Sequence, residues 1–378
     1  MALRKLTYPS FRQPSQVMFG TGSVRALAQP GVLERAVLLL SGDANVHRTL
    51  ARAFDNRGMA LDSSRILHKT AGEPTAASIT AAAAWLSQKP FDTLIAVGGG
   101  SVLDWARLSL AASRAWFDVN AGRLLPEIEP DERPRLILVP TTCGSGAEAA
   151  AVAVYTREGR KVPIVSDAFL GNLVVLDGQF LAPAPPAALA SWVSDALSHA
   201  VEAFVSIVPN ALAKHAAVGA LQAILQHYGA PDPHCRHERL MEAGYLGGVA
   251  ASNCSVGVVH AFAHTVSSHG APHGLANALG LMAGIAVNAD TSEMRDLLDR
   301  LNFSSVEALQ DAVRPITSEA QSAGIPARLR DVLHDPSERE AIAARMATDV
   351  CLRSNPRRLD RDGLMAFLDH VADGVARV

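Results

Sequence analysis

The sequence lacks long apolar runs and blocks of like charge. Its 378 residues contain no stretch of about eighteen uncharged apolar residues, as a membrane-spanning helix needs. Residues 1–14 lack the apolar core of a secretory signal. The formal net charge is -3 and no basic block occurs, so electrostatics give no reason to expect nucleic acid or an anionic membrane as a partner. We expect neither.

Cysteine is also scarce, and no CxxC pair occurs. A disulfide framework is therefore not expected at this chain length, and reduced thiols in a cytoplasmic protein are expected. Apolar residues make up 49% of the chain and charged residues 19%, which is typical of a globular protein long enough for two domains. The four cysteines are Cys143, Cys235, Cys254 and Cys351.

The first half alternates short apolar runs with helical stretches. The runs are rich in Val, Ile and Leu and are bounded by Gly, Pro or Asp, as buried strands are. Segments 46–58 and 75–90 have helical composition, so the pattern predicts a βαβ unit and a parallel sheet. The predicted strands are 36–41, 92–97, 135–140 and 172–177.

The pattern changes at LAPAPPAALA (181–190), where three prolines interrupt the chain. Beyond it the sequence predicts helices, for example over 190–206, 211–228 and 362–378, and no convincing strand. The predicted fold class is therefore α/β plus all-α. Residues 1–180 are expected to form an α/β domain, and residues 181–378 an all-helical domain.

Two glycine-rich turns follow predicted strands. In VGGGSVLDWAR (97–107), Gly98, Gly99 and Gly100 let the backbone approach a bulky anion, and Ser101 can cap the helix or bind phosphate. The simpler alternative is a tight turn without a ligand. PTTCGSGAE (140–148) is a second such turn, and two of them at the carboxyl ends of strands are typical of nucleotide sites in open α/β sheets.

One carboxylate and several histidines form the strongest pattern. Asp195 and His199 share a face of a predicted helix, although such a pair alone is usually a surface or capping contact. Segment 258–274 adds four histidines among mostly apolar or small residues, and His273 follows Pro272 in a predicted turn. Three neutral imidazoles and one carboxylate suit Fe(II), Zn(II), Co(II) or Ni(II) rather than Mg or Ca. The pattern predicts a Lewis-acid metal site.

These segments resemble the iron-containing (group III) alcohol dehydrogenase family. The matching motifs are GGGSVLDWAR, PTTCGSGAE, DALSHAVEAF, HAFAH and PHGLANAL, in the family's order. Weaker matches at 17–27 and 354–360 extend the resemblance over nearly the whole chain. The resemblance implies an N-terminal nucleotide-binding α/β domain, a C-terminal helical domain, and a homodimer or larger homo-oligomer.

The resemblance also implies roles for individual residues. His264 corresponds to a histidine beside the nicotinamide, and Lys161 to a lysine near the cofactor ribose. The implied metal ligands, with iron(II) as the first expectation, are Asp195, His199, His260 and His273. The implied contacts to NAD or NADP are Gly99, Gly100, Ser101, Asp104, Thr141, Thr142 and Ser145.

Three departures from the family pattern bear on specificity. The stretch between His264 and His273 is one residue shorter than is typical and contains His269. Arg107 replaces the family's usual lysine. In many NAD-using members an acidic residue after the strand equivalent to the predicted strand 36–41 accepts hydrogen bonds from the ribose hydroxyl groups. Here Gly42 takes that place, and Asp43 follows it. Gly42 removes repulsion toward a 2′-phosphate and Asp43 restores it, so both NAD and NADP stay open.

The expected reaction is metal-assisted hydride transfer between nicotinamide and a small alcohol or carbonyl compound. His264 either relays a proton or makes a shape-filling contact with the nicotinamide. The competing hypotheses are a glycerol or diol dehydrogenase, a sugar-phosphate cyclase of the dehydroquinate synthase type, and a binding protein with a dead site. The segment 258–274 offers little Lys or Arg for a phosphorylated substrate, which argues against the cyclase.

Overall fold

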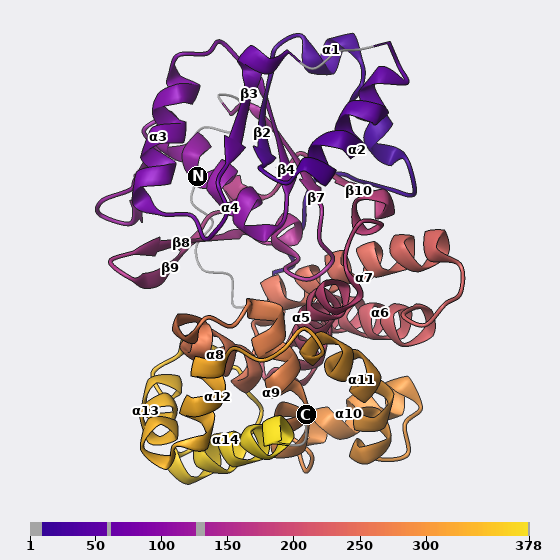
Figure 1. Cartoon of the computed structure of the whole chain (residues 1–378), viewed down its shortest axis with the longest axis vertical. Coiled ribbons are helices and arrows are strands. Elements are labelled where there is room, and N and C mark those ends of the chain that lie inside the picture. Colours follow the sequence, from indigo (N-terminus) through magenta and orange to yellow (C-terminus); the bar gives the residue numbers. More distant parts are fainter. Residues whose placement is uncertain (1–9, 59–61, 126–132, 377–378) are drawn as a thin grey trace. The chain divides into compact units, whose positions relative to one another are not determined.

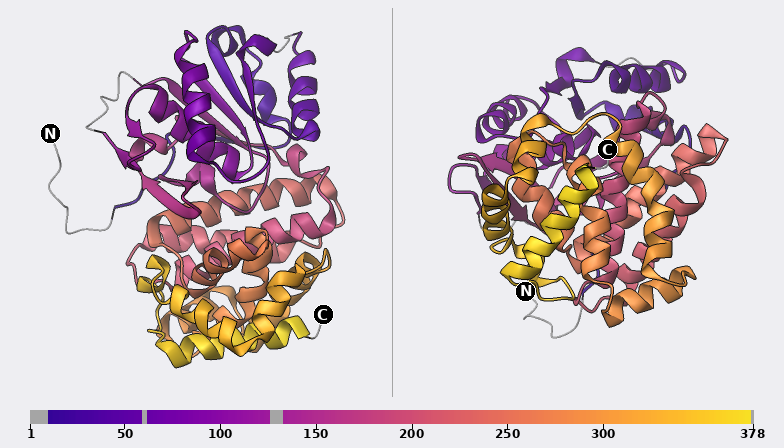
Figure 2. Two further views of the ribbon diagram at one scale, coloured as in Figure 1. Left: turned by 60° about the vertical axis from the view of Figure 1, so that its left-hand side comes forward. Right: turned by 60° about the horizontal axis from the view of Figure 1, so that its bottom comes forward.

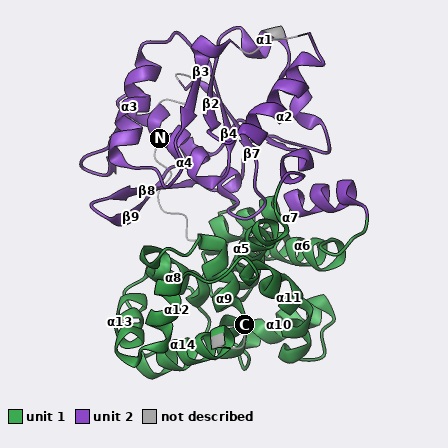
Figure 3. Cartoon of the chain, viewed as in Figure 1, with its two compact units in different colours: residues 1–11, 184–231, 243–378 green, residues 12–183, 232–242 purple. Residues whose placement is uncertain are grey.

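The computed structural model describes residues 10–58, 62–125 and 133–376. The chain divides into two compact units (Figure 3). The α/β unit comprises residues 12–183 and 232–242, and the helical unit comprises residues 1–11, 184–231 and 243–378. The segment 232–242 was not expected in the α/β unit. Within that unit, Glu238 accepts a hydrogen bond from the Thr21 backbone at 3.2 Å.

The α/β unit is built on a six-stranded parallel sheet. The four predicted strands are confirmed to within one residue. Two further strands at the sheet edges were not predicted, because they are short and only partly buried. One of them lies between the two predicted helices, so the chain makes two crossovers there instead of one. In spatial order the strands are β1 (Val17–Phe19), β10 (Leu173–Leu176), β7 (Arg135–Pro140), β4 (Thr93–Gly98), β2 (Ala36–Ser41) and β3 (Ile66–Lys69).

Helices cover both faces of this sheet (Figure 1). Helix α2 (Ala44–Asp55) lies on one face, and α3 (Ala76–Ser87) and α4 (Gly100–Ser113) lie on the other. Right-handed crossovers produce this arrangement, because the strand order reverses direction at β3. The smaller elements are α1 (Pro30–Leu33), the hairpins β5–β6 (Phe117–Asp118, Arg123–Leu124) and β8–β9 (Val152–Arg157, Arg160–Val165), and the 3₁₀ turns η1 (Ser23–Leu27), η2 (Ser63–Arg65), η4 (Ala147–Ala149), η5 (Asp167–Phe169) and η6 (Gly178–Leu181).

The helical unit gathers the C-terminal helices into one bundle, coloured from magenta through orange to yellow in Figure 2. In the described part of the chain, no strand follows β10. No single described helix is long and apolar enough to cross a membrane, and only α7 with α8–η7 meets that test together, as a pair bent by 101°. The helices after β10 are α5 (Pro186–Val205), α6 (Ala211–His227), α7 (Pro233–Cys254), α8 (Val258–Val266), α9 (His273–Val287), α10 (Ser292–Leu301), α11 (Val306–Gln321), α12 (Ala327–His334), α13 (Pro336–Met346) and α14 (Arg361–Ala376), with η7 (Ser267–His269) and η8 (Val350–Arg353). Of these, α7 is shared, because its residues up to Glu242 belong to the α/β unit.

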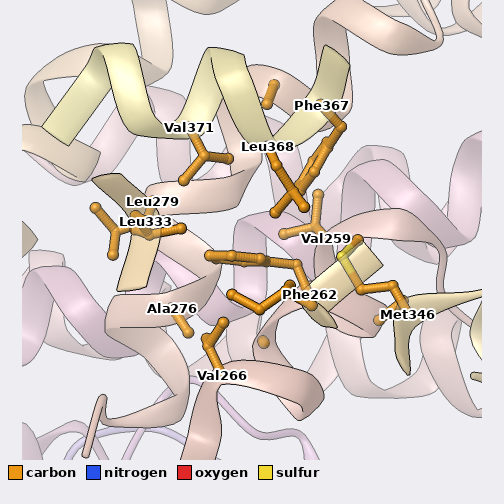
Figure 4. Close-up of a cluster of buried hydrophobic side chains, with 14 of the residues drawn as sticks. Val259, Phe262, Val266, Ala276, Leu279, Leu333, Met346, Phe367, Leu368 and Val371 are labelled. Atoms are coloured by element: carbon orange, nitrogen blue, oxygen red, sulfur yellow. The ribbon is translucent and has the colours of Figure 1, made fainter. Parts of the chain in front are cut away.

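One face of α8 is part of the core of this unit (Figure 4). Val259, Phe262 and Val266 are fully or almost fully buried there, and the Phe262 ring meets that of Phe367 from α14 at a centroid distance of 5.7 Å. Residues at this helical spacing share a face, so packing them inward fixes the rotation of α8 about its axis. The positions between them carry His260 and His264.

Candidate active site

Helix α5 presents a polar stripe in an otherwise apolar, buried helix. Asp195, His199 and Glu202 follow each other at i, i+4 and i+7, so they lie on one face. All three side chains are buried. Charged residues are almost never buried unless they are paired, so each of them must have a partner nearby.

One carboxylate oxygen of Asp195 lies at the centre of a histidine cluster. Its Oδ1 atom is 3.7 Å from His199 Nδ1, 3.6 Å from His260 Nε2 and 3.6 Å from His273 Nε2. The ligand atoms of Asp195, His260 and His273 all lie within 4.8 Å of one another. His199 is not in that group and joins it through its contact with Asp195, so the four residues named as metal ligands come together from α5, α8 and the first turn of α9. His273 begins α9, where the sequence analysis expected only a turn.

The charges in the cluster shift the pKa values of Asp195 and His260 in opposite directions. Burial raises the pKa of Asp195, but attraction to His199, His273 and His260 outweighs it and holds that pKa below its usual value. Burial lowers the pKa of His260, but the carboxylates of Asp195 and Glu202 outweigh it and raise that pKa to about 9. A histidine with a raised pKa holds its proton more tightly, and its nitrogen must lose that proton before it can bind a metal ion. Metal binding at this cluster should therefore release a proton.

The donor set fits a divalent transition metal. Donors about 2.1 Å from a tetrahedral ion stand roughly 3.4 Å from one another, close to the distances found around Asp195 Oδ1. His260 Nε2 is buried and has no hydrogen-bond partner among the described residues, which is costly for a polar atom unless something binds it. The His273 side chain is 30% exposed, so the cluster can be reached from its side.

Two residues that the sequence analysis missed hold these side chains. Glu202 Oε2 lies 2.6 Å from His260 Nδ1, and Asn277 donates a hydrogen bond to Asp195 Oδ1 at 2.7 Å. A local signal existed for both. Glu202 follows His199 on the same helical face, and Asn277 lies one turn after His273 in α9.

His264 stands beside the cluster. Its ring stacks on that of His273, with centroids 5.7 Å apart and planes at 13°. Its Nδ1 atom lies 3.0 Å from Asp349 Oδ2, and this contact lowers the pKa of Asp349 to about 2 against the opposing effect of burial. Asp349 precedes η8 and lies 85 residues away in sequence, so no local pattern could reveal it.

His269, noted in the shortened stretch, lies in η7 with its ring buried and Nδ1 3.3 Å from Ser268 Oγ. Burial lowers its pKa, with smaller contributions in the same direction from Arg345 and Arg328. His269 is not among the residues whose nitrogen atoms surround Asp195 Oδ1.

The two glycine-rich turns meet in the α/β unit. Strands β4 and β7 are neighbours, with Gly98 beside Pro140 in register. A Cβ atom at Gly99 would lie 3.3 Å from the Thr142 side chain, and one at Gly100 would lie 2.6 Å from Ser145 Oγ. Helix α4 begins there with Gly99 as N-cap and no side-chain cap, so its N-terminus is suited to a phosphate. Thr141, next to this contact, is buried, and Ser101 lies in the first turn of α4.

An open pocket adjoins the α4 N-terminus. It is lined by Ser41–Asp43, His68–Gly72 and Ser101–Val102, at the carboxyl ends of β2 and β3. Asp43 is the N-cap of α2, where its side chain accepts a hydrogen bond from the Asn45 backbone at 2.7 Å. The Lys69 Nζ atom donates to the carbonyls of Thr70 and Gly72.

Two other predicted cofactor contacts already have protein partners. Asp104 pairs with the buried Arg107, and its second oxygen accepts a hydrogen bond from the Val154 backbone at 3.0 Å. Lys161 forms an ion pair with Glu73 at 2.9 Å. In this structure Asp104 therefore joins α4 to β8, and Lys161 joins β9 to the segment before α3.

Residues 14–178 match the family described as iron-containing alcohol dehydrogenase, and residues 190–372 match the C-terminal part of the Fe-containing alcohol dehydrogenase family. The chain belongs to this family. It is thus an oxidoreductase, a metal-dependent and NAD(P)-linked alcohol dehydrogenase or aldehyde reductase. The resemblance inferred from the motifs is confirmed.

Relatives and solved structures agree with this placement. The chain is 29% identical to the probable alcohol dehydrogenase EutG of Salmonella typhimurium, over 92% of this chain and 91% of that protein. It is 31% identical to the lactaldehyde reductase of Escherichia coli, over 70% of this chain and 73% of that protein. The iron-containing alcohol dehydrogenase from Thermococcus thioreducens has the same fold, with a TM-score of 0.82 at 21% identity, over 97% of this chain and 100% of that one. The predicted fold class is confirmed.

Proposed function

We propose that Asp195, His199, His260 and His273 hold one divalent metal ion, iron(II) in the first instance and Zn(II), Co(II) or Ni(II) as alternatives. The observation that carries this proposal is the single Asp195 oxygen within 3.7 Å of three imidazole nitrogens. The lowered pKa of Asp195 keeps its carboxylate ionised at neutral pH. An ion held there supplies Lewis-acid polarisation of a carbonyl group.

We propose that His264 moves the proton that this reaction exchanges with solvent. The contact with Asp349 places a proton on Nδ1, so Nε2 carries the lone pair that can accept or deliver a proton. The side chain is 38% exposed, which leaves it open to water. Activity of His264→Ala that matches the wild type between about pH 6 and 9 would rule out this role in favour of a packing contact with the nicotinamide.

The paired glycine turns are the proposed site of the dinucleotide pyrophosphate, with Gly98, Gly99, Gly100, Ser101, Thr141, Thr142 and Ser145 around it. The pocket beside it suits the adenosine ribose of NAD better than that of NADP. Asp43 contributes a negative charge at its rim, and Lys69 is held by backbone carbonyls instead of pointing at a phosphate. We expect Asp43→Asn to raise kcat/KM for NADPH relative to NADH.

The proposed substrates are small alcohols and their aldehydes or ketones. Relatives named as lactaldehyde reductase and NADPH-dependent butanol dehydrogenase, and a similar structure named 1,3-propanediol oxidoreductase, make aldehydes and diols the first compounds to test. We also propose that the protein forms a homodimer or larger homo-oligomer. We place it in the cytoplasm, because its four cysteines are free thiols, as is usual in a reducing compartment. No nucleic acid or membrane partner is proposed.

The test is oxidation of NADH and NADPH by chelator-stripped protein with a panel of short aldehydes, together with reduction of NAD+ and NADP+ by the matching alcohols and diols. Each of Fe(II), Zn(II), Co(II) and Ni(II) is then added back. Aldehyde-dependent oxidation restored by one metal in the wild type, and lost by orders of magnitude in Asp195→Asn, is the expected result. Tight metal retention without turnover of any compound would favour the sugar-phosphate cyclase instead.

A further inference from the structure

Glu202 makes contacts that neither a packing residue nor a surface charge would make. It lies in α5 with its side chain 3% exposed. Its Oε1 atom accepts a hydrogen bond from the Val259 backbone at 2.6 Å. Its Oε2 atom lies 2.6 Å from His260 Nδ1 and 3.3 Å from the His260 backbone nitrogen. One carboxylate thus meets three N–H groups from a single turn of α8.

The N-terminus of α8 is shaped to receive this carboxylate. Its N-cap residue, Gly257, provides no side-chain cap, although the first N–H groups of a helix need acceptors. A Cβ atom at Gly257 would lie 2.9 Å from Glu202 Oε1 and 2.6 Å from Asn355 Oδ1. Asn355 in turn accepts a hydrogen bond from the Val258 backbone at 3.3 Å. The glycine therefore leaves room for two side chains from elsewhere to cap the helix.

The same carboxylate fixes the His260 ring. A hydrogen bond from Nδ1 to Glu202 leaves Nε2 as the ring atom that faces Asp195 Oδ1, 3.6 Å away. The ring cannot rotate without breaking a buried hydrogen bond to a charged group, which costs more than one between neutral groups. Val259 and Phe262 anchor the other face of α8 in the core (Figure 4).

We infer that Glu202 is a positioning residue for the metal centre. It caps α8 and holds the His260 imidazole so that Nε2 points into the four-residue cluster before any ion arrives. This inference rests on the proposed function, in which the cluster holds a divalent ion. Groups that orient a metal-binding histidine in this way commonly change metal affinity by about 10–100-fold when they are replaced.

The test is the affinity for Co(II), measured by competition with a chromophoric chelator and by the visible absorption of bound Co(II). Glu202→Gln keeps the side-chain shape. Whichever way its amide group is turned, however, the NH2 group faces either the Val259 N–H or His260 Nδ1, where the carboxylate has an acceptor oxygen. We expect Co(II) to bind about 10–100-fold more weakly and its absorption band to change, while circular dichroism stays that of the wild type. Titrations are carried out at a temperature at which each metal-free variant is folded.

The matched control is Asp335→Ala. Asp335 caps α13 in the same unit, where it accepts a hydrogen bond from the Ser337 backbone at 2.8 Å, but it contacts no histidine of the cluster. Loss of this cap should lower stability and leave the Co(II) affinity unchanged. If Glu202 has only a structural role, Glu202→Gln should likewise be less stable and keep its Co(II) affinity.

The outcomes separate the inference from the proposed function. Wild-type protein that binds no Co(II) would overturn both. Wild-type protein that binds Co(II) tightly, with folded Glu202→Gln within about twofold of it, would overturn the role of Glu202 alone. Should Glu202→Gln fail to fold, Glu202→Asp asks the same question, because it keeps the negative charge and removes one methylene from the reach to His260 Nδ1. Weaker Co(II) binding supports the inference there, and unchanged binding refutes it.

Discussion

Glu148 should make the α/β unit less stable as the pH rises. It lies in η4, immediately after the second glycine turn, and is 2% exposed. Burial raises its pKa to about 7, and its own backbone and the nearby Arg107 offset this only in part. Arg107 cannot neutralise it fully, because its guanidinium pairs with Asp104 and donates to the carbonyls of Ala147 and Ala150.

The sign and size follow from proton linkage. A folded-state pKa of about 7 against 4.5 for an ordinary glutamate means that the folded state binds the proton more tightly. The resulting stabilisation is complete below the unfolded-state pKa and is lost as the pH rises through the folded-state pKa. A difference of about 2.5 units corresponds to about 3 kcal/mol. Glu148→Gln stays neutral at every pH, so its stability relative to the wild type should rise by about that amount between pH 5 and 8.

Urea unfolding of metal-free protein at a series of pH values measures this difference. Trp85, Trp105 and Trp116 lie in the α/β unit and Trp192 in the helical unit, so a Trp192→Phe background makes the fluorescence report on the unit that contains Glu148. The exposed Glu34, replaced by Gln, serves as the control and should show no such trend. A Glu148→Gln difference that stays constant within about 0.5 kcal/mol from pH 5 to 8 would refute the reasoning.

Three further substitutions test the other parts of the molecule. Gly100→Ala places a Cβ atom 2.6 Å from Ser145 Oγ and should weaken NADH binding at least about tenfold in a fluorescence titration; an unchanged Kd contradicts the proposed pyrophosphate site. Asp349→Asn should lower kcat by about 10–100-fold with little change in KM or metal content, whereas wild-type kcat would show that Asp349 does not orient His264. Phe367→Ala should lower the free energy of unfolding of the helical unit by about 3–5 kcal/mol, measured by urea unfolding; a loss under about 1 kcal/mol would contradict the packing in Figure 4.

The sequence predicted those parts of the fold that have a local signal. Central strands such as 36–41 are buried on both faces, so they appear as continuous apolar runs. The edge strand Ile66–Lys69 is only partly buried and includes His68 and Lys69, so neither continuous apolarity nor alternation marks it. The start of α9 at His273 was missed for a related reason, because Pro272 is equally suited to a turn and to the residue before a helix.

The same distinction divides the site. Asp195 and His199 could be paired from sequence because the helical repeat brings them together, and Glu202 follows the same repeat. The contact of His264 with Asp349 joins residues 85 positions apart, and that of Glu202 with His260 joins residues 58 positions apart. Only tertiary packing brings these pairs together, so no local sequence pattern predicts either contact.

The groups that carry the two proposed binding functions are separated by unit. The metal-site residues and the side chains that hold them, from Asp195 through Asn277, all belong to the helical unit. The glycine turns and the pocket at Gly42 and Asp43 belong to the α/β unit. Because each set has its own hydrogen-bonded support, metal affinity and dinucleotide affinity should respond to different substitutions. Glu202→Gln should leave the Kd for NADH unchanged in metal-free protein, and Gly100→Ala should leave the Kd for Co(II) unchanged. A large change in the opposite property would show that the two affinities are energetically coupled, and the size of that coupling would be the same measured from either ligand.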